Sequence, residues 1–179
     1  MSLLFSRYPL NIGAPLKLIY PATKPLPAEV DLQGWLATSP RIKIGIVAGR
    51  TYGLELDALI KQHSGRFYQL AGEDAHSKLW QMLQKGRLDA VIDYSARITI
   101  LVESRESVRT SAIRGEPAFI TGYLVCNRSA KGQQLIHFFN TLLQQPALQQ
   151  QLLASYQQYF SSEEWQQVSA DITKQFQPD

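Results

Sequence analysis

Apolar runs of strand length alternate with helical patterns through the middle of the chain. A β-branched run predicts a strand at 42–48, and two further short strands are expected at 67–70 and 88–92. Between these strands, apolar residues recur at helical spacing over 54–63 and 74–85. Strands that alternate with helices of this length predict βαβ units, a parallel sheet and right-handed crossovers.

The two ends of the chain add strands and helices to this plan. Two further strands are expected at 15–20 and 119–126. Three helices are expected after them, at 132–143, 146–159 and 162–176. The last of these begins with a capping box formed by Ser161 and Glu164. Residues 98–102 are apolar, and their pattern favours a helix that begins near Ser95.

Composition and charge narrow the classes of protein to which the chain can belong. Its 179 residues are 45% hydrophobic and 18% charged, which suits one domain or two small lobes with a sizeable core. The formal net charge is +3, but the basic residues are scattered, so nucleic acid is not an expected partner. Residues 1–5 are not typical of a signal peptide. Cys126 alone cannot form an internal disulfide, and we expect it to be a small buried core residue.

The chain offers no motif that is typical of a catalytic site. His63, His76 and His137 lie on separate predicted helices without metal-ligand spacing, and each is expected at a surface or a helix end. The nucleophile elbow, the Walker loop and the dinucleotide-binding glycine pattern are all absent from the sequence. We therefore expect no enzymatic activity, no metal and no cofactor.

The turn after the strand at 42–48 is the leading candidate for ligand binding. The strand ends at Gly49, and Arg50, Thr51 and Tyr52 lead into the next helix. The amide groups at a helix start attract a carboxylate or phosphate, Thr51 can donate a hydroxyl hydrogen bond, and Arg50 can form a bidentate clamp. Open α/β sheets bind ligands beyond the carboxyl ends of their strands, where this turn lies. The alternative is an ordinary turn in which Thr51 only caps the helix.

A second polar segment follows the strand predicted at 88–92. Asp93 and Tyr94 come directly after this strand, and Arg97 is nearby. Because the carboxyl ends of parallel strands share one edge of a sheet, these side chains are expected on the same rim as residues 49–52.

Four short stretches of sequence are informative because of the order in which they follow one another along the chain. They are 5–9 (FSRYP), 42–51 (IKIGIVAGRT), 83–92 (LQKGRLDAVI), and 123–127 (YLVCN) with 132–140 (GQQLIHFFN). In this order and spacing they resemble the type II periplasmic solute-binding proteins, of the branch that binds amino acids and related molecules (extracellular solute-binding protein family 3). The resemblance covers nearly the whole chain.

The resemblance implies an α/β fold of the periplasmic binding protein-like II type. It implies a lobe with a parallel or mixed sheet flanked by helices, joined by hinge strands to C-terminal helices of an incomplete first lobe. The expected domains are 1–37 (end of lobe 1 and first hinge crossing), 38–116 (lobe 2) and 117–179 (return hinge strand and helices that pack on lobe 1). Family members have another βαβα segment before the first motif, so an N-terminally truncated form is expected. The face left open on lobe 1 would favour a homodimer or a domain swap.

The resemblance also bears on the ligand. In amino-acid binders, the sixth residue of the D-a-v-v-x-D segment is an aspartate that pairs with the ligand's ammonium group. Counted from Asp89, this position is Tyr94, whereas Asp93 lies one residue earlier and on the other face of a strand. A standard α-amino acid is therefore not implied. The family's carboxylate-binding arginine of the first lobe has no counterpart in this chain, because Arg7 does not match it.

The function that the resemblance implies is non-catalytic binding of a small polar solute, amino-acid-like or otherwise carboxylate-bearing, in an interlobe cleft in the periplasm. A membrane permease of an ABC transporter or a sensor domain would be the partner. The candidate ligand-binding residues are Gly49, Arg50, Thr51, Tyr52, Asp93, Tyr94 and Arg97. The alternative is a ligand-sensing input or effector domain of a signalling protein or transcriptional regulator.

Overall fold

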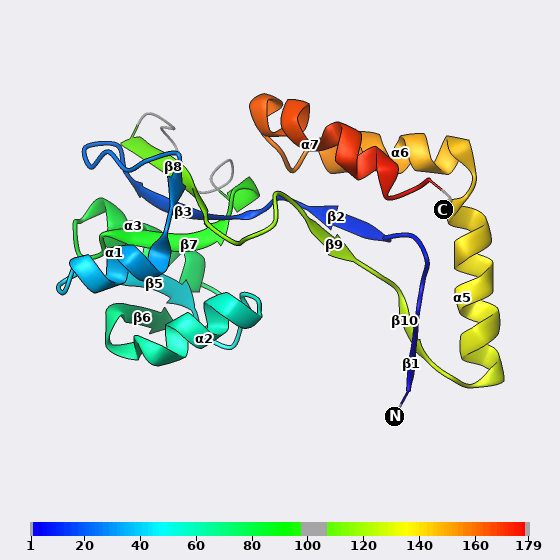
Figure 1. Cartoon of the computed structure of the whole chain (residues 1–179), viewed down its shortest axis with the longest axis horizontal. Helices are drawn as coiled ribbons and strands as arrows, with labels where there is room; N and C mark the ends of the chain where they lie inside the picture. The colour runs from blue at the N-terminus through cyan, green and yellow to red at the C-terminus, as the bar shows by residue number, and fades with distance from the viewer. Residues whose placement is uncertain (1, 98–106, 178–179) are drawn as a thin grey trace. The chain divides into compact units, whose positions relative to one another are not determined.

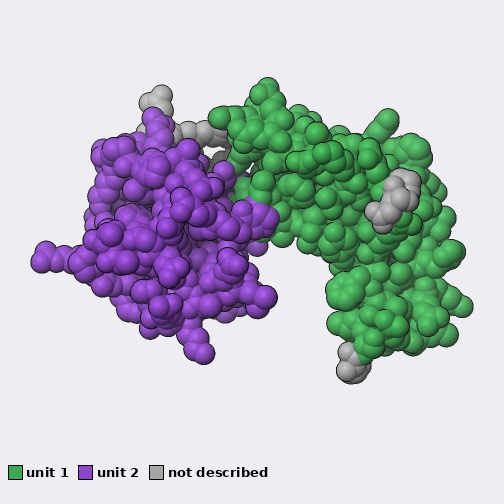
Figure 2. Space-filling model, in the orientation of Figure 1, with its two compact units in different colours: residues 1–15, 118–179 green, residues 16–117 purple. Residues whose placement is uncertain are grey.

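The chain divides into two compact units. A computed structural model describes residues 2–97 and 107–177 (Figure 1). Unit 1 comprises Met1–Pro15 with Ala118–Asp179, and unit 2 comprises Leu16–Pro117 (Figure 2). Residues 96–97 are helical, as expected for a helix that begins near Ser95, and the remainder of that prediction, 98–102, falls outside the described residues.

Unit 2 is built on a six-stranded mixed sheet with the order β4-β8-β3-β7-β5-β6. Its strands are β3 (Leu16–Pro21), β4 (Glu29–Val30), β5 (Ile44–Val47), β6 (Phe67–Leu70), β7 (Ala90–Tyr94) and β8 (Val108–Ile113). β5 is parallel to β6 and β7, and β4 is parallel to β8. β3 runs antiparallel to both β7 and β8. The expected α/β class is confirmed, with a sheet that is mostly parallel.

Helices flank this sheet (Figure 1). They are α1 (Leu32–Thr38), α2 (Leu54–Gln62), the 3-10 turn η1 (Ser64–Arg66) and α3 (Ala75–Gln84). One core cluster joins α3 to the sheet through Ile19, Leu79, Trp80, Leu83, Leu88, Val91 and Val108. A Cβ on Gly45 of β5 would lie 2.7 Å from Leu88 Cδ1 and 2.9 Å from Leu79 Cδ2. Glycine at this position is therefore what lets these side chains approach the strand closely.

The βαβ plan predicted for 42–92 is confirmed, but the bounds of one strand differ from the prediction. The strand expected at 88–92 forms at Ala90–Tyr94, so Asp93 and Tyr94 belong to the strand and not to the loop beyond it. β4 and β8 were not predicted. β8 has the sequence VRTSAI, and its polar residues interrupt the apolar run by which a strand would be predicted.

The described residues of unit 1 form two antiparallel strand pairs and three helices. β1 (Leu3–Phe5) pairs with β10 (Val125–Asn127), and β2 (Asn11–Gly13) pairs with β9 (Ile120–Gly122). The helices are α5 (Ala130–Leu143), α6 (Pro146–Gln157) and α7 (Ser162–Lys174). The single strand predicted at 119–126 is thus two strands. The break is held by Ser6, whose amide donates to the Leu124 carbonyl (2.8 Å) and whose hydroxyl accepts from the Leu124 amide (3.0 Å).

The ends of the helices in unit 1 follow local sequence rules. The capping box predicted at Ser161 and Glu164 is present in full. Ser129 caps α5 by accepting a hydrogen bond from the Gly132 amide, and a Cβ on Gly132 would overlap the backbone carbonyl oxygen of Asn127. Cys126 is half-buried and not buried as predicted, because it lies on a two-stranded ribbon.

Candidate ligand-binding site

Three parallel strands of unit 2 end at one edge of the sheet. β5, β6 and β7 have the same direction, so the segments that follow Val47, Leu70 and Tyr94 meet at this edge. Each of these three strands contributes to one polar network. Arg50 comes from the loop after β5, His76 from the first turn of the helix after β6, and Asp93 from the end of β7.

Asp93 is the centre of this network. Its side chain is 5% exposed, and both carboxylate oxygens are engaged. Oδ1 accepts hydrogen bonds from Arg50 Nη1 (2.8 Å) and from the Tyr94 amide (2.9 Å). His76 Nδ1 lies 2.7 Å from Oδ2, where an N–H on this nitrogen donates to the carboxylate. A buried carboxylate needs such partners, so Asp93 ties α3, β7 and the β5–α2 loop together.

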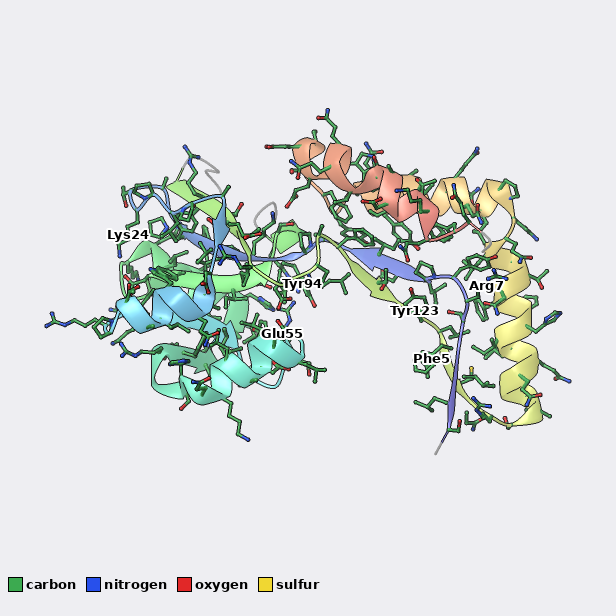
Figure 3. The ribbon with its side chains drawn as sticks, viewed as in Figure 1. Phe5, Arg7, Lys24, Glu55, Tyr94 and Tyr123 are labelled. Carbon is green, nitrogen blue, oxygen red and sulfur yellow. The ribbon has the colours of Figure 1, made fainter. Side chains whose placement is uncertain are left out.

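Arg50 is held on a second side by aromatic rings. Its guanidinium carbon lies 3.9 Å from the centre of the Tyr94 ring and 5.4 Å from the centre of the Tyr52 ring. Both distances are within the range of cation–π interaction. The Arg50 side chain remains 18% exposed, so it is not fully enclosed by these partners. Figure 3 shows Tyr94 at the end of β7.

The loop between β5 and α2 is fixed by Tyr52. Its hydroxyl accepts a hydrogen bond from the Val47 amide (2.8 Å) and also lies 3.3 Å from the Val47 carbonyl oxygen. Burial raises the pKa of Tyr52, although the hydrogen bond from Val47 and the Arg50 charge act in the opposite direction. Gly49 and Gly53 have φ values of +75° and +100°, which disfavour other residues. The loop therefore closes on itself and presents Arg50 at its tip.

The start of α2 carries negative charge. Its N-cap is Gly53, so Thr51 does not cap the helix, and Glu55 and Asp57 lie in the first turn. Asp57 accepts a hydrogen bond from the Tyr52 amide (2.9 Å). Burial raises the pKa of Glu116, and the nearby charges of Glu55 and Asp57 raise it further. These carboxylates oppose an anion at the helix start, which leaves Arg50 as the group suited to one.

No family model and no curated protein sequence matches the chain. Solved structures do match its fold. An ancestral cationic amino acid solute-binding protein matches with a TM-score of 0.59 and 13% identity, over 89% of this chain and 62% of its own. An ancestral arginine-binding protein bound to arginine matches with a TM-score of 0.56 and 17% identity, over 86% and 64%. The chain has the periplasmic binding protein-like II fold.

A Streptococcus mutans protein described with glutathione import has the same fold. It matches with a TM-score of 0.57 and 15% identity, over 86% of this chain and 62% of its own. The chain thus spans less than two thirds of the length of these periplasmic binding protein-like II structures. At such low identity the likeness concerns the fold alone, so the chemistry of the site rests on the residues of this chain.

The structure brings together four of the seven ligand-binding residues that were predicted from the sequence. Arg50, Tyr52, Asp93 and Tyr94 form one cluster, linked by the contacts described above. The other predicted residues, all of them exposed, are Gly49, Thr51 and Arg97.

Sequence reasoning missed two residues at this edge. His76 lies at a helix end, as expected, but its contact with Asp93 was not predicted, and its side chain is only 20% exposed. Ser95 directly follows Tyr94, and its hydroxyl is buried with no hydrogen-bond partner among the described residues. His76 had a usable signal: it lies in the first turn of the helix after β6, where a parallel sheet directs side chains to the ligand edge.

Two further findings concern the described residues only. Within 2–97 and 107–177, no group of three or more His, Cys, Asp or Glu side chains is placed to hold a metal ion. In the same part of the chain, no helix has the length and apolar character needed to cross a membrane.

Proposed function

We propose that the chain binds a small polar solute, amino-acid-like or otherwise carboxylate-bearing, at the carboxyl edge of the unit 2 sheet. The observation that carries this proposal is the fixed position of Arg50. Its guanidinium is held by Asp93 and Tyr94 at the edge where open α/β sheets bind ligands. A cation that is already in place costs less conformational entropy when an anionic ligand group binds to it.

The fold supports a role in uptake. The matched structures include an arginine-binding protein and the substrate-binding protein of an amino acid ABC transporter. By analogy, this chain would deliver its solute to a membrane permease from the periplasm. The same analogy allows a ligand-sensing input or effector domain, and the domains encoded beside this chain would separate the two roles.

The proposed site is tested by a thermal-shift screen of amino acids and organic acids. A ligand raises the Tm of the protein that binds it. Arg50→Ala and Tyr94→Ala are expected to abolish that rise, whereas Arg87→Ala, a change at an exposed arginine elsewhere in unit 2, should leave it intact. Full retention of the rise in both site variants would exclude this edge as the binding site.

The proposal includes binding without chemical change. It rests on the lack of any catalytic motif in the sequence. Mass spectrometry of a stabilising compound after long incubation with the protein tests it directly. The compound should be recovered unchanged, and a new product that requires the protein would show that the chain is an enzyme.

A second copy of the chain is the partner proposed for unit 1. Leu3, Phe5 and Val125 lie on one face of the β1–β10 ribbon by its register, and they are 47%, 59% and 43% exposed. Leu135 and Phe138 of α5 are 43% and 56% exposed. Apolar residues so exposed favour association. Light scattering should show a dimer that Phe5→Glu with Phe138→Glu converts to a monomer; a wild-type monomer at high concentration would contradict this.

A further inference from the structure

The contacts of Asp93 limit the class of ligand that the proposed site can take; this step rests on the proposed function. Asp93 is the carboxylate of the network, and it is 5% exposed. Its oxygens already accept from Arg50, the Tyr94 amide and His76. Asp93 is therefore a positioning residue for Arg50, and it has no oxygen directed to the ammonium group of a ligand.

Arg50 has N–H donors that its hydrogen bond to Asp93 does not use. A guanidinium carries five N–H groups, and the Nη1 contact with Asp93 uses one of them. The Tyr94 ring stacks against the guanidinium at 3.9 Å and so restricts its orientation. The Arg50 side chain is 18% exposed, and a guanidinium whose donors are not all used can bind a carboxylate through two parallel hydrogen bonds.

Ser95 provides an independent sign of a missing partner. It lies one residue after Tyr94, is 9% exposed, and its hydroxyl has no hydrogen-bond partner among the described residues. Buried polar groups are paired in the great majority of cases, and an unpaired one costs free energy. The hydroxyl oxygen itself is buried, so a ligand group that pairs with it must displace the atoms that cover it, and the pairing would then remove that cost.

We propose that Arg50 and Ser95 bind the carboxylate of an organic acid, and that this site does not require an α-ammonium group on the ligand. An ammonium placed beside Arg50 would meet a like charge, and Asp93 is not free to offset it. The ligand class is therefore organic anions, such as dicarboxylates, in preference to zwitterionic amino acids. Ser95 is a ligand-binding residue in this scheme.

Matched pairs of compounds test the ligand class. Glutarate and glutamate differ only in the α-ammonium group, as do succinate and aspartate. NMR titration of the 179-residue chain detects even weak binding and shows which amides respond. We expect the acid of each pair to bind as tightly as the amino acid or more tightly, with shifts at residues 49–53 and 93–95. Tighter binding of glutamate and aspartate would overturn the inference while leaving the proposed function intact.

Variants test the two residues. Arg50→Gln should weaken glutarate binding about tenfold to a hundredfold, the range for a hydrogen-bonded charge pair. Ser95→Ala should weaken it about tenfold and leave the Tm of the free protein unchanged or higher, because the unpaired hydroxyl is gone. Arg114→Gln and Ser77→Ala, at exposed positions of unit 2, are the matched controls and should bind glutarate normally. Normal binding by the Ser95 variant would remove Ser95 from the site.

The positioning role of Asp93 has its own readout. If Asp93 acts through Arg50, Asp93→Asn should weaken glutarate binding in the wild type but have no further effect in the Arg50→Gln background. Additive effects would mean that Asp93 acts independently of Arg50 and would contradict the scheme. No response to any of the four compounds would count against the proposed function itself, and the inference would fall with it.

Discussion

Replacing Asp93 with alanine is expected to destabilise unit 2 by about 3 kcal/mol. The carboxylate is 5% exposed and accepts hydrogen bonds from three donors. Hydrogen bonds to charged groups contribute about 1.5–3 kcal/mol each, so three of them suggest a loss of about 5–9 kcal/mol. Arg50 and His76 are 18% and 20% exposed, so both regain water once the carboxylate is gone. This recovery brings the expected loss down to the low end of the range for breaking a buried ion pair, about 3–5 kcal/mol.

Urea unfolding followed by tryptophan fluorescence measures this loss, because Trp80 lies in the core of unit 2. Asp93→Asn keeps the volume and an oxygen that can accept from Arg50, so it should cost less, about 1–2 kcal/mol. Glu29→Ala is the control, since Glu29 is 55% exposed and pairs with an exposed Arg114; it should cost under about 1 kcal/mol. A loss of less than about 0.5 kcal/mol for Asp93→Ala would refute the structural role given to this network.

Three further substitutions test the packing and charges of the two units. Gly45→Ala forces a methyl group against two buried leucines and should cost about 1–3 kcal/mol of unfolding free energy in urea, whereas Gly13→Ala, where nothing lies within 4 Å, should cost less. Gly132→Ala meets the backbone of Asn127, which cannot turn aside, so hydrogen exchange should show faster opening of α5; unchanged exchange would contradict the overlap. Folding raises the pKa of Glu116 above 4.5, so stability is lost as pH rises from 4.5 through the raised pKa. Glu116→Gln should therefore raise the Tm at pH 7 and leave it unchanged at pH 3.5, and an equal effect at both values would disprove the linkage.

The central βαβ region was predictable because its pattern is local and strong. β5 is an apolar run, β6 is a short segment that begins and ends with an apolar residue, and α2 and α3 have apolar residues at helical spacing, so each element shows in its own sequence. β8 was missed because its stability depends on distant partners. Ser111, a polar residue in this strand, is 1% exposed, and its hydroxyl bonds to the Pro27 carbonyl and the Tyr20 hydroxyl, contacts that no local pattern contains.

The candidate site was predictable only to the level of its edge. The rule that parallel strands share a carboxyl edge is enough to place Arg50 and Tyr94 together from the sequence alone. The partners inside the edge depend on tertiary geometry. His76 contacts Asp93 because α3 packs over β7, and Ser95 stands out only through the absence of a partner among the described residues.

At the proposed site, the two residues at the end of β7 oppose one obvious route to a change of ligand class, the substitution Tyr94→Asp. Asp93 and Tyr94 point to opposite faces of the strand, yet both contact Arg50, which meets Asp93 by its edge and Tyr94 by its plane. Tyr94→Asp would add the carboxylate that an ammonium group needs, but it would also remove the ring that orients Arg50. The new carboxylate would compete with Asp93 for the same guanidinium. If Arg50 binds the carboxylate as proposed, Tyr94→Asp alone is not expected to give an amino-acid site, because the guanidinium depends on the aromatic residue that would be lost.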